Sequence, residues 1–238
     1  MDIGKAFTYP FEDERWVTKS LLGAVVWAIP IVNFAWGGYM IDLLKNVIAG
    51  NPRPLPEWGD FGDKWIKGGL LVVAGLIYSI PALVLACIPL TLLGGLAGFQ
   101  GDNISDSALG LLSGVGGLFA CLIAVYSLAL SFYYPAIYIH FARLGEFRAF
   151  FEFGHINKII RADLGKYLTA WVVSLLAGIF VGLVLGGVST LLGFIPCIGW
   201  ILSWAVAAIT GVYLFYIYAH IFAQVVTPAS AMTVTPAE

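Results

Sequence analysis

The sequence predicts an all-α membrane protein, a polytopic helix bundle of about four spanning helices plus an N-terminal re-entrant or broken helical hairpin. Hydrophobic residues make up 60% of the 238 residues and charged residues only 11%, whereas soluble domains have about 45–50% apolar and about 25% charged residues. Four apolar segments are long enough, at about 20 residues or more, to cross a hydrocarbon core of about 30 Å. These segments cover 68–99, 108–142, 167–192 and 197–226.

The distribution of charge predicts the topology of these segments. All 12 Lys and Arg residues fall in three groups, at 5–19, 45–67 and 143–166. Loop 100–107 carries acidic charges only, and short loops rich in Lys and Arg stay on the cytoplasmic side. We therefore expect a multi-pass protein of the inner (plasma) membrane. Its N-terminus and loops 42–67 and 143–166 would be cytoplasmic, and loop 100–107 would lie outside.

Segment 20–41 does not fit this scheme as a single crossing. Basic groups flank it at both ends, and Pro30 stands near its middle. We expect a half-helix up to Ile29, a turn at Pro30, and a helix that returns through Lys45. Irregular backbone of this kind persists at membrane depth only where other protein covers it. The alternative is an ordinary spanning helix that violates the charge rule.

A weak internal repeat indicates three helical hairpins, which cover 15–49, 64–148 and 164–226. Each hairpin begins with an interfacial aromatic residue and a Lys, and two of them end in matching Tyr-x-His sequences at His140 and His220. We expect residues 1–226 to form a single integral membrane domain. Residues 227–238 are rich in Ala, Thr and Pro and predict a flexible C-terminal tail.

Aromatic residues stand beside basic residues in the connectors, an arrangement typical of the membrane–water interface. The predicted membrane-interface anchors are Trp16, Trp58, Phe61, Trp65, Phe147 and Phe151. Residues 143–166 mix Phe and Ile with Arg and Lys, and they predict an amphipathic helix suited to the membrane surface.

Small side chains recur every four residues in the fourth apolar segment. The stripe consists of Ser174, Gly178, Gly182, Gly186 and Thr190. Such a stripe lies along one helix face and lets another helix approach closely. Two interpretations remain open, an interface with a partner subunit and packing within the chain's own bundle.

Few polar side chains of the apolar segments suggest a site. Asp42 and Lys45 are spaced i, i+3 and predict an interfacial ion pair. His140 and His220 each end an apolar segment; they are candidate ligands of a pigment, metal or haem if they converge, and hydrogen-bonded interfacial histidines otherwise. His155 is expected to contact headgroups or water. The three cysteines are far apart in apolar stretches and predict small buried side chains without a metal.

Several blocks of the sequence together resemble one family of membrane proteins. They are 9–16, Lys19, 29–31, Gly38 with Tyr39, Asn46 with Val47, Gly50, 55–58, 60–62 and 151–171. The family comprises the bacterial and archaeal membrane proteins known as domain of unknown function 4013. The resemblance implies a multi-pass membrane protein, and it transfers no activity and no catalytic residue.

The sequence holds no nucleotide-binding glycine loop with its Lys, no His-Glu-x-x-His motif and no serine nucleophile elbow. We expect no enzyme and no cofactor, but a non-catalytic accessory or scaffold subunit of a larger membrane protein complex. Its partners would be other integral membrane subunits and lipids, and not nucleic acid. One alternative is a transporter or channel for a small or lipophilic solute, which a cavity lined by Asn33, Tyr78 or Tyr126 would favour. Another is a membrane-surface or lipid-binding protein.

Overall fold

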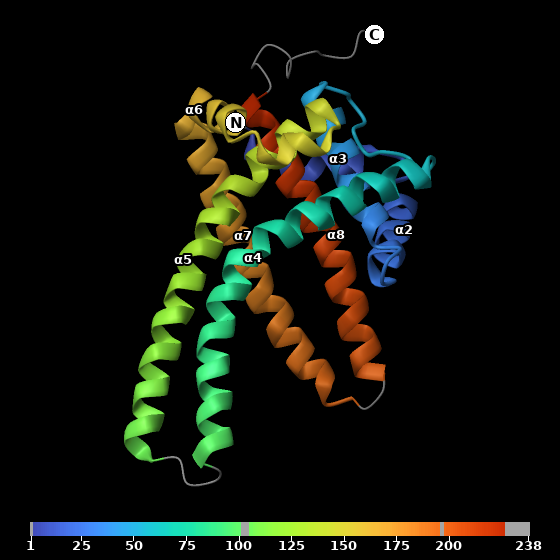
Figure 1. The fold of residues 1–238 in the computed structure, drawn as a ribbon. Coiled ribbons are helices and arrows are strands. Elements are labelled where there is room, and N and C mark those ends of the chain that lie inside the picture. The colour runs from blue at the N-terminus through green and yellow to red at the C-terminus, as the bar shows by residue number, and fades with distance from the viewer. Residues whose placement is uncertain (1, 101–104, 196–197, 227–238) are drawn as a thin grey trace, which may run out of the picture. The chain divides into compact units, whose positions relative to one another are not determined.

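The computed structural model describes residues 2–100, 105–195 and 198–226, and every regular element in these ranges is helical (Figure 1). The elements are α1 (Ile3–Thr8), η1 (Tyr9–Glu12), α2 (Trp16–Ala28), α3 (Phe34–Ile48), α4 (Phe61–Gln100), α5 (Asp106–Leu144), η2 (Phe147–Phe151), α6 (Phe153–Ala162), α7 (Leu164–Gly193) and α8 (Ile198–Val226). This confirms the predicted all-α fold class. The predicted flexible tail 227–238, residues 101–104 of the predicted outer loop and Cys197 lie outside the described residues.

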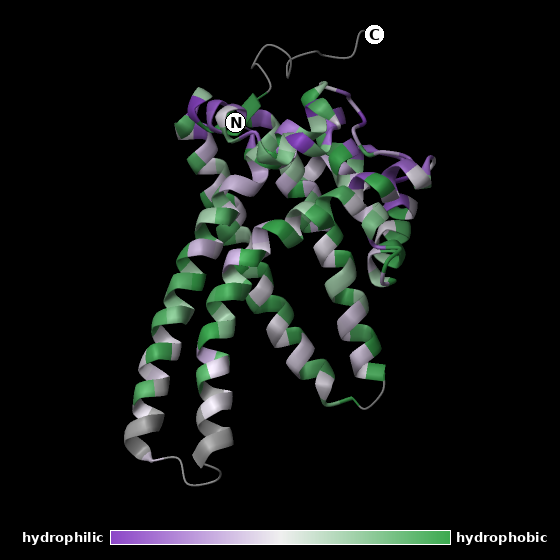
Figure 2. Ribbon diagram, in the orientation of Figure 1, coloured by the Kyte–Doolittle hydropathy of each residue, from purple (hydrophilic) through white to green (hydrophobic). Residues whose placement is uncertain are grey.

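Within the described ranges, four helices are long and apolar enough to cross a membrane, as predicted. Their spanning segments are Phe61–Leu92, Ser113–Leu144, Leu164–Gly193 and Ile198–Val226. Figure 2 shows hydrophobic residues along α4, α5, α7 and α8 and hydrophilic residues concentrated in the shorter elements and connectors. Large side chains on these helices, such as Leu76, Leu183 and Trp200, are more than half exposed, so lipid is the medium that covers them. Cys87 and Cys121 are exposed as well, so their expected burial is wrong; both stand on such lipid-facing surfaces.

The chain divides into two compact units. They are Met1–Val72 with Pro135–Glu238, and Val73–Tyr134. In the smaller unit, the Tyr126 hydroxyl donates a 2.7 Å hydrogen bond to the carbonyl oxygen of Tyr78, and Tyr134 packs edge-on against the Tyr78 ring. The helix pairs α2–α3 and α7–α8 fall within the predicted hairpin ranges 15–49 and 164–226, whereas α4 begins at Phe61, before the predicted range 64–148. The division into units falls inside this second range.

The second half of α8 lies at the centre of the core of the larger unit. Helices α1, α2, α3 and α7 all contact α8. Large side chains from four helices are less than 2% exposed there: Tyr39, Phe141, Tyr167, Tyr216 and Phe222. The N-terminal and C-terminal thirds of the sequence therefore share one core.

The N-terminal hairpin (α2 and α3) is broken where the sequence predicts. Helix α2 has 13 residues and ends at Ala28, and α3 has 15 residues and begins at Phe34; a single crossing needs about 20. An uninterrupted spanning helix over 20–41 is therefore wrong. In the turn, Ile31 has φ +71°, a left-handed conformation that β-branched residues rarely adopt. The Trp65 indole N–H donates a 2.9 Å hydrogen bond to the Ile31 carbonyl oxygen and holds this turn.

Helix α3 crosses the first turns of α4 with the two backbones in contact. A Cβ atom at Gly38 would overlap the carbonyl oxygen of Lys64, and one at Gly68 would overlap the carbonyl oxygen of Phe34. Glycine is the residue that permits such an approach. We call this contact the α3–α4 crossing; it brings the start of α4 against the N-terminal hairpin.

Candidate ligand cavity

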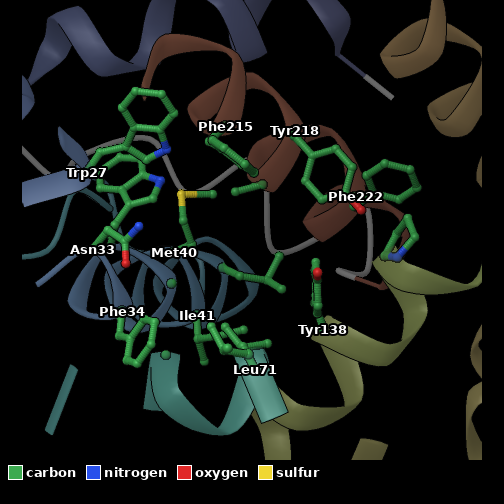
Figure 3. A pocket seen from close by; sticks show the side chains of 17 residues that line it. Trp27, Asn33, Phe34, Met40, Ile41, Leu71, Tyr138, Phe215, Tyr218 and Phe222 are labelled. Carbon is green, nitrogen blue, oxygen red and sulfur yellow. The ribbon is translucent and has the colours of Figure 1, made fainter. Parts of the chain in front are cut away.

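A cavity of about 340 Å³ lies in the larger unit, between the N-terminal hairpin, the start of α4, the end of α5 and α8. Aromatic side chains dominate its wall: Trp27, Phe34, Trp36, Tyr138, Phe215, Tyr218 and Phe222. Figure 3 shows Trp27, Asn33 and Met40 on one side of this space and Tyr138, Tyr218 and Phe222 on the other. We call it the aromatic cavity.

The α3–α4 crossing builds one wall of the aromatic cavity. A Cβ atom at Gly37 would lie 3.2 Å from both the Cα atom of Gly68 and a methyl carbon of Leu71, and all three residues line the cavity. The wall is therefore made of helix backbone and one leucine, with no space for larger residues at the glycines.

Polar groups interrupt this apolar lining, among them the Asn33 amide and the hydroxyls of Tyr138 and Tyr218. The Asn33 amide lies in the turn of the N-terminal hairpin. The indole nitrogen Nε1 of Trp36 is buried and has no hydrogen-bond partner among the described residues. A buried donor without a partner costs about 1–3 kcal/mol, and this nitrogen is covered by protein atoms rather than open to the cavity.

A buried ion cluster fixes the start of the N-terminal hairpin. The Lys19 ammonium lies 2.7 Å from the Asp13 carboxylate, each side chain is 7% exposed, and Lys19 also reaches Glu57 at 2.9 Å and donates to the Leu55 carbonyl oxygen. Burial acts to raise the pKa of Asp13, but the hydrogen bonds from Lys19 and the Arg15 amide and their positive charges outweigh it and lower that pKa. The cluster therefore gives Asp13 a structural role at the start of the N-terminal hairpin.

The predicted ion pair between Asp42 and Lys45 is wrong. Asp42 instead lies 2.7 Å from Lys67 and 3.4 Å from Lys64, and Lys67 also lies 2.6 Å from Asp63. The reason is tertiary: the α3–α4 crossing brings the first turns of α4 beside Asp42, and these lysines outcompete a partner on the same helix.

His140 and His220 have different partners, and the structure does not bring them into one site. His220 stacks on Tyr9 with ring centroids 4.5 Å apart, and its Nδ1 atom accepts a 2.8 Å hydrogen bond from the amide of Gln224. His140 donates from Nε2 to the Glu152 carboxylate at 2.8 Å. This hydrogen bond is the main cause that lowers the pKa of Glu152.

His155, which was expected to contact headgroups or water, is an exposed side chain that also packs against His140. The two imidazole rings stack with centroids 5.4 Å apart, and His155 Nδ1 lies 3.5 Å from Glu152. Sequence reasoning missed this cluster; the only signal was the Glu-x-x-His spacing of Glu152 and His155, which places both side chains on one helix face.

The small-residue stripe lies on α7. No described atom approaches within 4 Å of a Cβ built at Gly178, Gly182 or Gly186. Thr190 donates a hydrogen bond to the Gly186 carbonyl oxygen, and the buried Ser174 hydroxyl has no hydrogen-bond partner in the described part of the chain. Within the described residues, therefore, the glycines of the stripe are not used for a close helix approach.

The predicted interface anchors occupy different environments. Phe61 and Trp65 are 41% and 38% exposed. The Trp58 ring stacks on Tyr39 at 4.5 Å and its indole N–H donates to the Lys19 carbonyl oxygen. The remaining anchors each pack against a neighbouring ring: Trp16 on Phe11, and Phe147 on Phe151. The connector helix α6 is shorter than predicted and buries Ile156, Ile159 and Ile160 in the protein.

The four long apolar helices and the cavity beside them define the class: this is a multi-pass α-helical membrane protein. The chain belongs to the family described as protein of unknown function (DUF4013), whose model matches residues 21–194. The match covers the N-terminal hairpin, the α3–α4 crossing, the connector and α7. Comparison with curated proteins and with solved structures finds no match.

Proposed function

We propose that the protein is a non-catalytic membrane protein that binds a lipophilic molecule, such as a lipid acyl chain, in the aromatic cavity. The observation that carries this proposal is the cavity itself, a space of about 340 Å³ with an aromatic and aliphatic wall. Binding sites for small molecules are typically clefts of about 300–1,000 Å³ with an apolar lining and a few polar groups.

The chemistry of the wall favours a neutral, elongated ligand. No charged side chain occurs among the described residues that line the cavity, so a charged solute would lack a counter-charge there. The Asn33 amide offers hydrogen bonds to one polar end of a ligand. Apolar surface along Leu71 and Met40 suits the hydrocarbon part.

A pair of matched variants on α4 tests this proposal. Leu71→Trp places a larger side chain in the cavity, whereas Leu76→Trp makes the same change at a residue that is 61% exposed. Purified protein is incubated with a hexadecanol analogue that carries a photoreactive group, and labelled peptides are identified by mass spectrometry. We expect labelling of α3 and α8 peptides in the native protein and in Leu76→Trp, and a loss of at least tenfold in Leu71→Trp.

Equal labelling of both variants, or labelling that avoids α3 and α8, would refute binding in the cavity. Transport of the same molecule is a stronger form of the proposal, since broken helices at membrane depth recur in transporters. In vesicles, transport predicts flux of a fluorescent fatty alcohol that Leu71→Trp slows and Leu76→Trp does not.

A second candidate function is an accessory or scaffold subunit of a larger membrane protein complex, with another integral membrane subunit as partner. The observation that favours it is the open stripe on α7, where the Cβ positions of Gly178, Gly182 and Gly186 meet no described atom within 4 Å. Gly178 lies across a small pocket from α8, and exposed small residues such as Gly182 and Gly186 are suited to close contact with a partner's helix.

Extraction from native membranes in mild detergent, followed by mass determination, tests this second candidate. We expect a stoichiometric membrane subunit that Gly182→Leu removes. Gly187→Leu is the matched control, because Gly187 also meets no described atom but lies off the stripe. A single species without partners, or equal loss in both variants, would refute it.

We further propose the inner (plasma) membrane as the location, with loops 42–67 and 143–166 cytoplasmic and loop 100–107 outside. The charge distribution supports this orientation. In a background without native cysteines, an impermeant maleimide should label Ser105→Cys in intact cells and Lys158→Cys only after lysis. The reverse pattern would invert the topology.

A further inference from the structure

Three side chains with metal-binding chemistry meet where α5 passes into α6. His140 lies in the last turns of α5, Glu152 immediately precedes α6, and His155 lies in its first turn. One donor atom from each residue lies within 4.8 Å of the other two. All three belong to the larger unit, and none lines the aromatic cavity.

We propose that His140, Glu152 and His155 form a binding site for a divalent first-row transition metal ion, zinc above all. Two imidazole nitrogens and one carboxylate oxygen form a donor set that such ions prefer. Glu152 lies 2.8 Å from His140 Nε2 and 3.5 Å from His155 Nδ1. Bonds of about 2.0–2.1 Å in a tetrahedral arrangement separate neighbouring donor atoms by about 3.3 Å, so small side-chain shifts suffice.

The backbone around the cluster is held by contacts that need no metal. Gly145 has φ +71° and turns the chain after α5. The Phe150 ring then stacks on Phe141 at 4.4 Å, and Phe150 and Ile156 are 1% and 0% exposed. These apolar anchors fix the positions from which Glu152 and His155 reach His140, so the donors are preorganised.

Accessibility differs among the three donors in the way that a surface metal site requires. The side chains of His140, Glu152 and His155 are 9%, 28% and 61% exposed. His140 is thus a fixed inner ligand, and His155 lies on the side from which an ion enters. Three protein ligands leave at least one coordination position for water.

One neighbouring charge opposes a bound cation. Arg148 lies 3.7 Å from the second carboxylate oxygen of Glu152. Its guanidinium is 68% exposed and lies 2.6 Å from Glu146, so this charge is both solvated and paired. The hydrogen bond from His140 to Glu152 must also break, since Nε2 of a neutral imidazole binds a metal only as the tautomer that carries its proton on Nδ1. Removal of the Arg148 charge should tighten metal binding.

Matched carboxylate variants test the site in the full-length protein, purified with an affinity tag that contains no histidine. Zinc affinity is measured by calorimetry, and Co²⁺ absorption in the visible range reports nitrogen and oxygen coordination. Glu152→Gln and His155→Ala should each weaken zinc binding at least tenfold. Glu12→Gln makes the same chemical change at an exposed carboxylate outside the cluster and should leave affinity within about threefold, while Arg148→Ala should increase it.

Each outcome decides the proposal. Absence of saturable binding by the native protein at about 100 μM zinc would overturn it, and so would equal affinity of native protein, Glu152→Gln and His155→Ala. His155→Ala removes an exposed side chain, so loss of folding does not explain its result. The proposal does not depend on the lipophilic ligand, because none of the three donors lines the aromatic cavity. Leu71→Trp should therefore leave zinc affinity unchanged.

Discussion

The two glycine-rich helix faces of this protein have opposite environments. At the α3–α4 crossing, Gly38 and Gly68 touch the backbone of the facing helix, and no larger residue fits. Along α7, Gly178, Gly182 and Gly186 meet no described atom within 4 Å. The periodic stripe on α7 is the stronger sequence signal, yet the isolated glycines make the close approach. Small residues permit contact between helices, and only the neighbouring element decides whether contact occurs.

Specific polar contacts between helices accompany the α3–α4 crossing, where the glycines touch a facing helix. The α3–α4 crossing has Asp42 with Lys67 at one side and the Trp65 hydrogen bond to Ile31 at the other. The buried pair of Asp13 and Lys19 fixes the start of the N-terminal hairpin. In the stripe on α7, Thr190 donates a hydrogen bond to the Gly186 carbonyl oxygen of its own helix. The N-terminal region should therefore be far more sensitive to substitution than α7.

The largest expected effect is at the buried ion cluster. Lys19→Met leaves the Asp13 carboxylate buried without its counter-charge, and breaking a buried pair in this way costs about 3–5 kcal/mol. Thermal unfolding in detergent measures the loss. Arg15→Met is the control, since the Arg15–Glu57 pair is exposed and such pairs contribute at most about 1 kcal/mol. Equal losses for both variants would contradict the buried role.

The next effect is at the α3–α4 crossing. Gly68→Ala introduces a Cβ atom that overlaps the Phe34 carbonyl oxygen, so the helices must separate. Overpacking of this kind typically costs about 1–3 kcal/mol and more against rigid backbone. The same unfolding assay should show this loss for Gly68→Ala but none for Gly69→Ala, because Gly69 meets no described atom within 4 Å. An unchanged unfolding temperature of Gly68→Ala would contradict the backbone contact between α3 and α4.

A pH effect sharpens the account of the ion cluster. The pKa of Asp13 is lowered from its ordinary value of 3.8, so the folded protein binds this proton less tightly than the unfolded chain. The stabilisation is therefore fully present above about pH 4 and is lost as the pH falls through the lowered pKa. Unfolding temperature should drop below pH 4 in the native protein, and Asp13→Asn should show a smaller drop over the same interval.

The smallest effect is on α7. Gly182→Ala adds a methyl group where no described atom lies within 4 Å, and Ala is more favourable than Gly inside a helix by about 0.5–1 kcal/mol. The variant should unfold at an equal or slightly higher temperature. A clear loss of stability would show that α7 packs closely along this face.

Sequence reasoning and structure agree most closely on features that depend on nearby residues. The break at Pro30 lies between two helices too short to cross a membrane, as predicted. The spanning segments follow from runs of apolar residues, because each must satisfy its backbone within its own helix. The pairing of Asp42 was predicted wrongly, since i, i+3 spacing supplies a partner only when no better one arrives from another helix.

The candidate sites, in contrast, depend on residues that are far apart in the sequence. The aromatic cavity combines residues as distant in sequence as Trp27 and Phe222, and no local pattern links them. His140 was considered with His220 because their sequence contexts match, whereas the structure pairs it with Glu152 and His155. The turn at Gly145 and the buried Phe150 bring these residues together, and neither carries a metal-binding signature.

The sequence by itself determined that lipid surrounds the long helices, and it determined the class and the family of this protein. These properties follow from the hydropathy and length of continuous segments, which need no tertiary structure. Only the tertiary structure decided which glycines touch, which charges pair and which aromatic rings enclose a cavity. Those outcomes depend on side chains brought together from distant parts of the chain, and they are fixed by the competition between all partners that the packed helices offer.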